Sequence, residues 1–463
     1  MKLKAKRSLP FLIFMILFLF FSSPGLQASV MEFSIHDEVK LGEKFYNYIR
    51  AHYPIVYDPY VNTFIKGLSH RIIRAIPPQP FHITVDVIRD PQINAFAGPG
   101  GHVFLNTGII ELMDNEAELA AVICHELAHV TQRHLAQNIE RERLLTVGSL
   151  VGMLAGALIG RSVGSAVAFG SVAGAQTAML KYTREEEREA DQIGIQYLTK
   201  AGFPPKAMIG AFEKLRRIKI MSGENNIPPY FLTHPGIEDR ISYLSDMLKN
   251  LPSPHFHPSP IFLKIKALIL GEYSDPARGI KMVEDVLKGA SPCELTLARA
   301  ILFSRLNQIK TAEKLFSHTK CAATIPVWYR EMGIFYFNLG RLNTALKCLN
   351  LGLREYPDDY FALFFRGRIY GSQGKVDKAL ADLKRVLNYA PEDSEVHEVM
   401  GRILGRYRSP FLGFLHFAYA ALYRGNKKMA MSYIKRASAL AKTREEKREL
   451  KIFKKRFRAW KEL

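Results

Sequence analysis

Two histidines and a glutamate stand together in the sequence AAVICHELAH, which covers residues 120–129. His125 and His129 are four residues apart, so on a helix their imidazoles leave the same face and can share one Zn²⁺. Glu126 directly follows the first histidine and can take a proton from a water molecule whose pKa zinc lowers to about 7. With 14 histidines and 44 acidic residues in 463 positions, chance would produce such a string only about 0.04 times. The string therefore predicts a zinc site built for hydrolysis.

The residues around this string predict a buried helix. Asn115 and Glu118 have the spacing of a capping box at its first turn, and the positions that follow are apolar on nearly every side. The alternative is that His125 and His129 are ordinary core histidines that form hydrogen bonds within the protein. That alternative is disfavoured, because two histidines and a glutamate in one core need a reason to be there.

A third ligand is expected from a second helix, in the stretch 182–194, YTREEEREADQIG. Glu187 and Asp191 are four residues apart and share a helix face, while Ala190 and Gly194 are small enough to let this helix approach the first one closely. We assign Glu187 as the third metal ligand and Asp191 as the carboxylate that orients a liganding histidine. A solvated, charged face is the alternative; it fits the other glutamates but explains the two small residues less well.

These motifs resemble the gluzincin peptidases, a family that includes the CAAX prenyl proteases, HtpX and the mitochondrial OMA-type protease. The segment 94–108, NAFAGPGGHVFLNTG, is similar to the family's active-site edge strand. This resemblance implies that an extended substrate pairs with the segment by strand addition. The residues assigned to this substrate strand are Asn94, Gly100, Gly101 and Val103.

A further motif, Thr233-His234-Pro235 followed by Arg240, resembles a family motif that lies near the metal. The resemblance implies catalytic roles for His234 and Arg240, in which one of them steadies the oxyanion. For His234 three roles stay open: it hydrogen-bonds the tetrahedral intermediate, it binds substrate, or it fills the open zinc position at rest.

The pattern along the chain predicts an α+β fold with two domains. Residues 29–250 mix strand-like and helical patterns, which indicates a mainly helical zinc-peptidase domain with a small edge-strand sheet. Residues 251–260, LPSPHFHPSP, indicate a linker. Residues 261–463 are helical throughout, with a 34-residue period that resembles the tetratricopeptide repeat and predicts an α-solenoid with a protein-binding groove. The alternative is a helical domain that only packs against the peptidase domain. The clearest recurring positions are Gly333, Ala345 and Pro357, followed by Gly367, Ala379 and Pro391.

Residues 1–28 have the pattern of a secretory signal peptide: basic residues, an apolar run over residues 9–21, and a small-residue cleavage site. The chain is therefore expected in the periplasm. Lys and Arg outnumber acidic residues 64 to 44, which gives a net charge of +20. Because an exported protein rarely meets nucleic acid, we expect this charge to serve contact with an anionic membrane surface rather than with nucleic acid.

Residues 144–180 are rich in Gly and Ala and carry a single charge, Arg161. One hypothesis is a transmembrane hairpin, since each half approaches the minimum length of a span. The favoured one is a lid near the active site that dips into the membrane, because Gly, Ala and Ser insert poorly. The four cysteines are too few for a disulfide scaffold, and a pairing of Cys293 with Cys321 is left open.

Together these features predict an endopeptidase of the cell envelope that holds one Zn²⁺ per chain and cleaves unfolded or misassembled proteins, which the repeats help to bind. The domain order resembles periplasmic family members that degrade stalled outer-membrane proteins and assist their assembly. That resemblance implies outer-membrane substrates and the outer-membrane assembly machinery as a partner. The alternative is a non-enzymatic or latent chaperone or adaptor that uses the repeats while its metal site is held closed.

Overall fold

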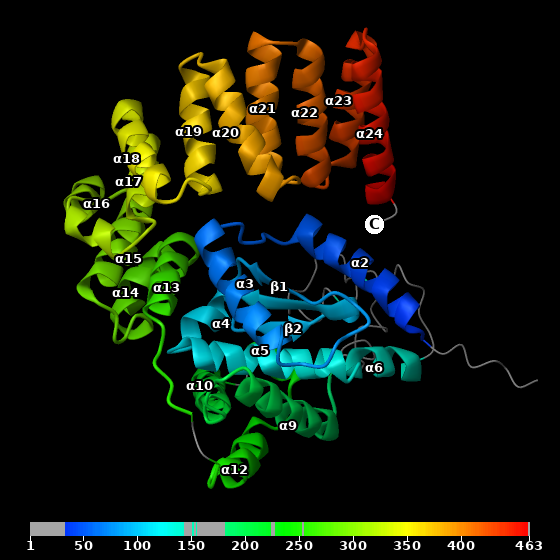
Figure 1. Cartoon of the computed structure of the whole chain (residues 1–463), viewed down its shortest axis with the longest axis vertical. Helices are drawn as coiled ribbons and strands as arrows, with labels where there is room; N and C mark the ends of the chain where they lie inside the picture. Colours follow the sequence, from blue (N-terminus) through cyan, green and yellow to red (C-terminus); the bar gives the residue numbers. More distant parts are fainter. Residues whose placement is uncertain are drawn as a thin grey trace, which may run out of the picture.

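The computed structural model describes residues 33–142, 151, 154, 181–223, 227–251 and 254–461 (Figure 1). The predicted signal peptide and nearly all of the stretch 144–180 lie outside the described residues, so the lid and hairpin hypotheses are not tested. Among the described helices, none has both the length and the apolar character needed to cross a membrane.

The described residues of the N-terminal part form eight longer helices, three strands and two short helical turns. In chain order they are α2 (Ile35–His52), α3 (Pro59–Ile73), β1 (Thr84–Ile88), β2 (Ala95–Ala97), η1 (Pro99–Gly101), β3 (His102–Asn106), α4 (Thr107–Leu112), α5 (Glu116–Thr131), α6 (His134–Glu142), α9 (Arg184–Lys200), α10 (Ala207–Ser222), α11 (Tyr230–Thr233) and α12 (Ile237–Leu248). The sheet lies between two helical layers. On one face Phe96 and Phe104 pack against Phe45 of α2. On the other face Val87 and Val103 join the core that α3 and α5 share.

The strand order is β1-β3-β2, so β3 is the central strand. Val103 pairs with Val85 in the parallel neighbour β1 and with Ala97 in the antiparallel neighbour β2. A strand paired on both sides has no free backbone groups for a substrate. The expectation that an extended substrate pairs with Val103 is therefore wrong. On this side of the sheet, the outermost described strand is β2.

Gly100 and Gly101 lie in the turn η1 between β2 and β3, where both are buried and have positive φ angles of 71° and 92°. This turn packs closely on α2: a Cβ atom on Gly42 would lie only 2.5 Å from the Pro99 carbonyl oxygen and 2.9 Å from Gly100 Cα. Glycine is required here by the left-handed backbone and by the close approach of the helix. The expectation that these two glycines line a substrate strand is thus replaced by a packing role.

The C-terminal part is a series of antiparallel helix pairs that forms an arc along one side and over the top of the N-terminal part in Figure 1. Its elements are α13 (Pro260–Tyr273), α14 (Pro276–Val286), α15 (Pro292–Arg305), α16 (Ile309–Phe316), η4 (Thr319–Ala323), α17 (Trp328–Asn338), α18 (Leu342–Glu355), α19 (Tyr360–Ser372), α20 (Val376–Tyr389), α21 (Ser394–Tyr407), α22 (Pro410–Tyr423), α23 (Lys427–Leu440) and α24 (Arg444–Lys461). A disulfide joins Cys293 to Cys321, the pairing that the sequence left open. The α+β prediction, a helical domain with a small sheet followed by helical repeats, is confirmed.

The two parts share one continuous hydrophobic core, which runs from Ile65 of α3 through Ile265 of α13 to Trp328 of α17. A buried ion-pair network adds to it. Arg330 Nη2 of α17 lies 2.7 Å from an oxygen of Asp58, the residue that caps α3. The repeats are therefore built onto the N-terminal part as one body and are not a loosely tethered module.

Candidate metal centre

Helix α5 runs through the centre of the N-terminal part and carries His125, Glu126 and His129. Asn115 caps it by accepting hydrogen bonds from the Ala117 and Glu118 amides at 3.0 and 3.1 Å. The predicted capping box is not completed, because the Glu118 carboxylate accepts from the Asp114 amide instead. Since every residue of α5 from Glu116 to Val130 is buried, polar side chains on it must find partners inside the protein.

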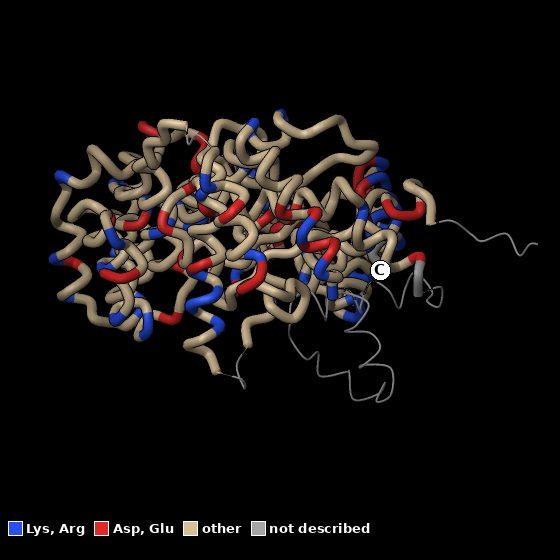
Figure 2. Tube along the Cα trace, turned by 90° about the horizontal axis from the view of Figure 1, so that it is seen from below, with Lys and Arg blue, Asp and Glu red and all other residues tan. Residues whose placement is uncertain are grey.

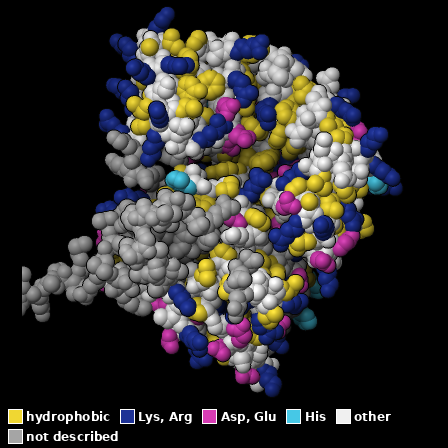
Figure 3. Space-filling model, turned by 180° about the vertical axis from the view of Figure 1, so that it is seen from behind, with side chains coloured by type: hydrophobic (Ala, Val, Ile, Leu, Met, Phe, Trp, Pro, Cys, Tyr) yellow, Lys and Arg dark blue, Asp and Glu magenta, His cyan; other side chains and the backbone are white. Residues whose placement is uncertain are grey.

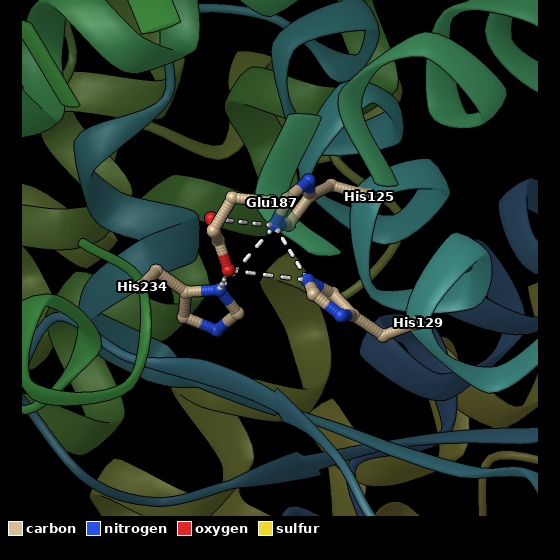
Figure 4. A group of neighbouring side chains, drawn as sticks. All are labelled: His125, His129, Glu187 and His234. Atoms are coloured by element: carbon tan, nitrogen blue, oxygen red, sulfur yellow. Dashed lines mark hydrogen bonds and ion pairs between the residues drawn. The ribbon is translucent and has the colours of Figure 1, made fainter. Parts of the chain in front are cut away.

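Four side chains from three elements converge in this interior: His125 and His129 of α5, Glu187 of α9, and His234, which follows α11 (Figure 4). One potential ligand atom from each lies within 4.8 Å of all the others. The two α5 imidazoles approach to 3.2 Å between their Nε2 atoms, and the Glu187 carboxylate lies 3.4 Å from His129 and 3.6 Å from His125. His234 Nδ1 lies 2.9 Å from Glu187 Oε1. All four side chains are at most 2% exposed.

The donor set fits a zinc ion. Imidazole nitrogens and a carboxylate oxygen are the ligands of catalytic zinc sites, which use three protein ligands and keep one position open. Glu126 supports this fit independently: both of its carboxylate oxygens are buried and have no hydrogen-bond partner among the described residues. A buried carboxylate in that state is costly unless a group such as water or a metal shares its site.

Asp191 lies behind the ligands, one helical turn after Glu187 on α9. Its Oδ1 atom is 3.0 Å from His125 Nδ1, which leaves His125 Nε2 to face the other ligands. Tyr243 also donates to Asp191. Burial alone raises the pKa of Asp191, but the Arg240 guanidinium and His125 outweigh burial and hold that pKa below its usual value. The structure thus brings Asp191 to the position that the spacing of the motif suggested.

Arg240 of α12 binds the acidic side chains of α9. Its Nε atom lies 2.8 Å and its Nη2 atom 2.6 Å from the Asp191 oxygens, and it pairs with Glu187 as well. Burial raises the pKa of Glu187, but the Arg240 guanidinium and the imidazoles of His234 and His129 outweigh burial and hold that pKa well below its usual value. A cavity of about 530 Å³ opens between the starts of α9 and α12, and Glu187 and Arg240 line it. Arg240 therefore contacts the ligand Glu187 directly. Among the described residues, no contact joins Arg240 to Glu126, beside which the oxyanion would form.

His234 lies over the centre of the site, where Tyr230 stacks on its ring at 4.4 Å between centroids. Its Nε2 atom is 3.6 Å from Glu126 Oε1. Burial lowers the pKa of His234, but the facing carboxylates of Glu187 and Glu126 outweigh this effect and raise the pKa overall. This position, within reach of the ligands and of Glu126, leaves both the ligand role and the hydrogen-bonding role of His234 open.

The substrate-strand assignment also included Asn94, which directly precedes β2. It is buried, and its carbonyl oxygen accepts the Asn106 amide at 3.0 Å. The backbone of this residue therefore belongs to the β2–β3 ladder. Strand β2 is adjacent to the helix that carries the histidines, because it contacts α5 directly.

Sequence reasoning missed His134, the first residue of α6. Its Nδ1 atom lies 2.9 Å from His129 Nδ1, and its Nε2 atom lies 3.2 Å from the carboxylate of Glu189. The turn that aims it comes from Arg133, whose φ of 56° is rare for a residue other than glycine. The signal was present as a histidine five residues after His129, but a helix continued straight through this stretch would have pointed it elsewhere.

We expect His134→Ala to weaken zinc affinity about 10- to 100-fold, because His129 would lose the partner that fixes its tautomer and ring orientation. Competition with a chromophoric chelator measures this affinity. His134→Asn, whose amide can replace the Nδ1 contact, should restore most of it. Equal affinity of wild type and His134→Ala would contradict the orienting role.

Comparisons with known proteins agree with this geometry. Residues 58–248 match the model of Peptidase family M48, and residues 362–393 match a tetratricopeptide repeat. The chain is 36% identical over 246 residues to the beta-barrel assembly-enhancing protease of Yersinia pestis and 32% identical over 287 residues to that of Escherichia coli. These alignments cover 52% and 61% of this chain. It is also 29% identical over 192 residues to the mitochondrial metalloendopeptidase OMA1 of Schizosaccharomyces pombe, which covers 42% of this chain.

The matched regions span 50%, 58% and 54% of those three relatives, so the chain spans about half the length of each. All four converging side chains, His125, His129, Glu187 and His234, fall inside the matched range 58–248. The site therefore lies in the region that matches peptidase family M48, residues 58–248, and a region that matches a tetratricopeptide repeat, residues 362–393, follows it.

Proposed function

We propose that this protein is a zinc-dependent endopeptidase of the cell envelope. The observation that carries the proposal is Glu126, a buried carboxylate without a hydrogen-bond partner among the described residues, beside a convergent set of two histidines and a glutamate. A structural zinc site is usually closed by cysteines or by four protein ligands and has no use for such a carboxylate. A hydrolytic site needs a base at this place.

His125, His129 and Glu187 would hold the ion, one per chain, and Asp191 would orient His125. A zinc ion bound there supplies Lewis acidity, which makes water acidic near neutral pH and polarises a carbonyl group. Glu126 takes the proton of the attacking water and delivers it to the leaving amine nitrogen. His234, whose raised pKa favours the protonated ring, is placed to donate a hydrogen bond to the oxyanion.

For the substrate we propose an extended chain that adds to the edge of β2 that no described strand occupies. The ladder bonds of Asn94 and Gly98 to β3 turn the backbone groups of Ala95 and Ala97 toward the other side of the strand. An unfolded or misassembled protein offers such extended segments, whereas a folded one does not. Because Ala95–Ala97 are buried, this edge must be uncovered before substrate can pair with it.

The cellular role is proposed from the relatives. Two of them are named beta-barrel assembly-enhancing proteases, which supports misassembled outer-membrane proteins as substrates and the outer-membrane assembly machinery as a partner. The helical repeats would supply the protein-binding surface. The signal-peptide pattern at the N-terminus supports a periplasmic location.

A second candidate function follows from His234. Its ligand atom lies within 4.8 Å of those of His125, His129 and Glu187, so a set of all four ligands would close the site. The protein would then be a latent enzyme, or a chaperone that uses its repeats, until His234 leaves the metal.

Cleavage of unfolded casein by the purified chain tests both candidates. For an active enzyme we expect cleavage that a chelator abolishes and zinc restores, and a rate about 100-fold lower in His234→Ala, since an oxyanion donor is lost. For a latent enzyme the wild type is inactive and His234→Ala gains activity. If neither protein cleaves casein with zinc bound, the peptidase proposal fails.

A further inference from the structure

The last two helices of the chain carry a large share of its positive charge. Residues 427–461 contain fourteen Lys and Arg against three Glu, which gives +11 of the total charge of +20. Every Lys and Arg from 427 to 458 is exposed. Basic residues are frequent at this end of the charge-coloured trace (Figure 2), and dark-blue side chains line the corresponding edge of the surface (Figure 3). We call the exposed side chains of residues 427–458 the basic end face.

Packing explains why the charge points outward. Helix α24 attaches to α22 and α23 through one apolar stripe, in which Leu450 and Phe453 are buried and Phe457 is half-buried. This stripe is all that α24 needs to cover the hydrophobic end of the repeats. The opposite side of α24 can therefore carry any polar residue. Lysine and arginine fill it at positions such as Lys447, Lys451 and Lys454.

Acidic side chains do not neutralise this face. Glu446 is used at the start of α24, where its carboxylate accepts the amides of Lys442 and Thr443 at 2.7 and 2.9 Å. Among the described residues, none of the cations from 427 to 458 forms an ion pair, whereas the neighbouring Arg424 does pair with Glu398. The acidic residues therefore compensate the positive field of this face only in part, and the remaining field acts on whatever approaches it.

Large apolar side chains are exposed among these cations. Met429, Met431 and Ile452 are 48%, 50% and 44% exposed. Single exposed apolar residues are ordinary, but here they sit within a surface of lysines and arginines. That combination suits the interface of a bilayer, where cations meet headgroup phosphates and apolar side chains enter the acyl boundary. A surface for single-stranded nucleic acid would instead present aromatic rings for base stacking.

We propose that α23 and α24 form a docking surface for an anionic phospholipid bilayer. Contact through the end of the repeats would hold the protein against the membrane by charge and a few apolar side chains, without a spanning segment. The end of α6, after which the Gly/Ala-rich residues 144–180 follow in sequence, lies on the same side of Figure 1. The proposal does not depend on the proposed peptidase activity, because α23 and α24 contribute no residue to the metal centre.

Co-sedimentation of the purified chain with vesicles tests the proposal. The wild type should bind vesicles of phosphatidylcholine with 30 mol% phosphatidylglycerol, and it should not bind vesicles of pure phosphatidylcholine. Raising the salt concentration from about 50 to 500 mM should release the bound protein. The test variant replaces four lysines of α24 by Glu: Lys447, Lys451, Lys454 and Lys455. We expect its binding constant for the anionic vesicles to fall at least about 100-fold, because each basic residue near the surface contributes to the attraction.

The matched control replaces Lys281, Lys288, Lys310 and Lys314 by Glu. These are also exposed lysines of the repeats, but they belong to α14–α16 at the far end of the arc (Figure 1). This control variant has the same net charge as the α24 variant. Its binding constant for the anionic vesicles should stay within about threefold of the wild-type value. Equal losses in the two variants would show that overall charge, and not this surface, governs binding.

Two further results would overturn the proposal: wild type that does not bind anionic vesicles at low salt, or wild type that binds a fluorescent single-stranded oligonucleotide more tightly than the vesicles. Thermal unfolding by circular dichroism checks that both variants are folded. If the α24 variant is unfolded, Lys451→Glu with Lys455→Glu replaces it and should lose about tenfold in vesicle binding.

Discussion

Glu126→Gln is expected to lower the rate of casein cleavage about 1,000-fold or more while zinc content stays at one ion per chain. The physical reason is that glutamine has nearly the shape of glutamate but cannot accept the proton of the attacking water, and general base catalysis contributes roughly 10²- to 10⁴-fold. Metal binding should survive because Glu126 is not one of the assigned ligands. Rates are measured on purified protein with zinc determined on the same samples.

Glu43→Gln provides the control, since it removes an exposed carboxylate of α2 and should leave the rate of cleavage unchanged. The same Glu126→Gln protein, expressed in cells, should hold substrates uncut and allow them to be identified by mass spectrometry. Cleavage by Glu126→Gln at a rate near that of the wild type would refute the role of Glu126.

Arg330→Ala is expected to lower the free energy of unfolding by about 3–5 kcal/mol, the cost of leaving buried carboxylates without their cation. Arg330 is 1% exposed and holds three acidic groups: Asp58 at 2.7 Å, Glu331 at 2.7 Å and Asp359 at 3.3 Å. Asp58 caps α3 and Asp359 caps α19, so this one side chain ties the two parts of the molecule together. Burial raises the pKa of Glu331 well above its usual value, further than Arg330 can lower it.

Urea unfolding followed by circular dichroism measures this loss. The control is Arg341→Ala, because Arg341 forms an exposed pair with Glu313 and such pairs contribute at most about 1 kcal/mol. A loss below about 1 kcal/mol in Arg330→Ala would mean that the apolar core alone joins the two parts.

The sequence predicted the parts of the site that are set by local spacing. A spacing of four positions from His125 to His129, and from Glu187 to Asp191, fixes which side chains share a helix face whatever the rest of the fold does. The small residue Gly194 correctly indicated close helix packing: a Cβ atom there would lie 3.3 Å from the backbone of Cys124 on α5. The 34-residue period likewise predicted the helical repeats.

Features that depend on the path of the chain were not predictable in this way. Strand order depends on which segments return to the sheet, so β3 was mistaken for an edge although β1 covers it. The contact of His134 depends on one left-handed residue, Arg133, at the end of α5. The pair between Asp58 and Arg330 joins residues 272 positions apart, and no local pattern specifies such a partner.

Anomalous diffraction at the zinc absorption edge, from crystals of the purified wild-type protein, tests the central claim most directly. The account predicts one strong anomalous peak per chain, between the Nε2 atoms of His125 and His129 and the carboxylate of Glu187. A map without a peak at these side chains, or with its peak at another place in the chain, would contradict the assignment of this site as a zinc centre.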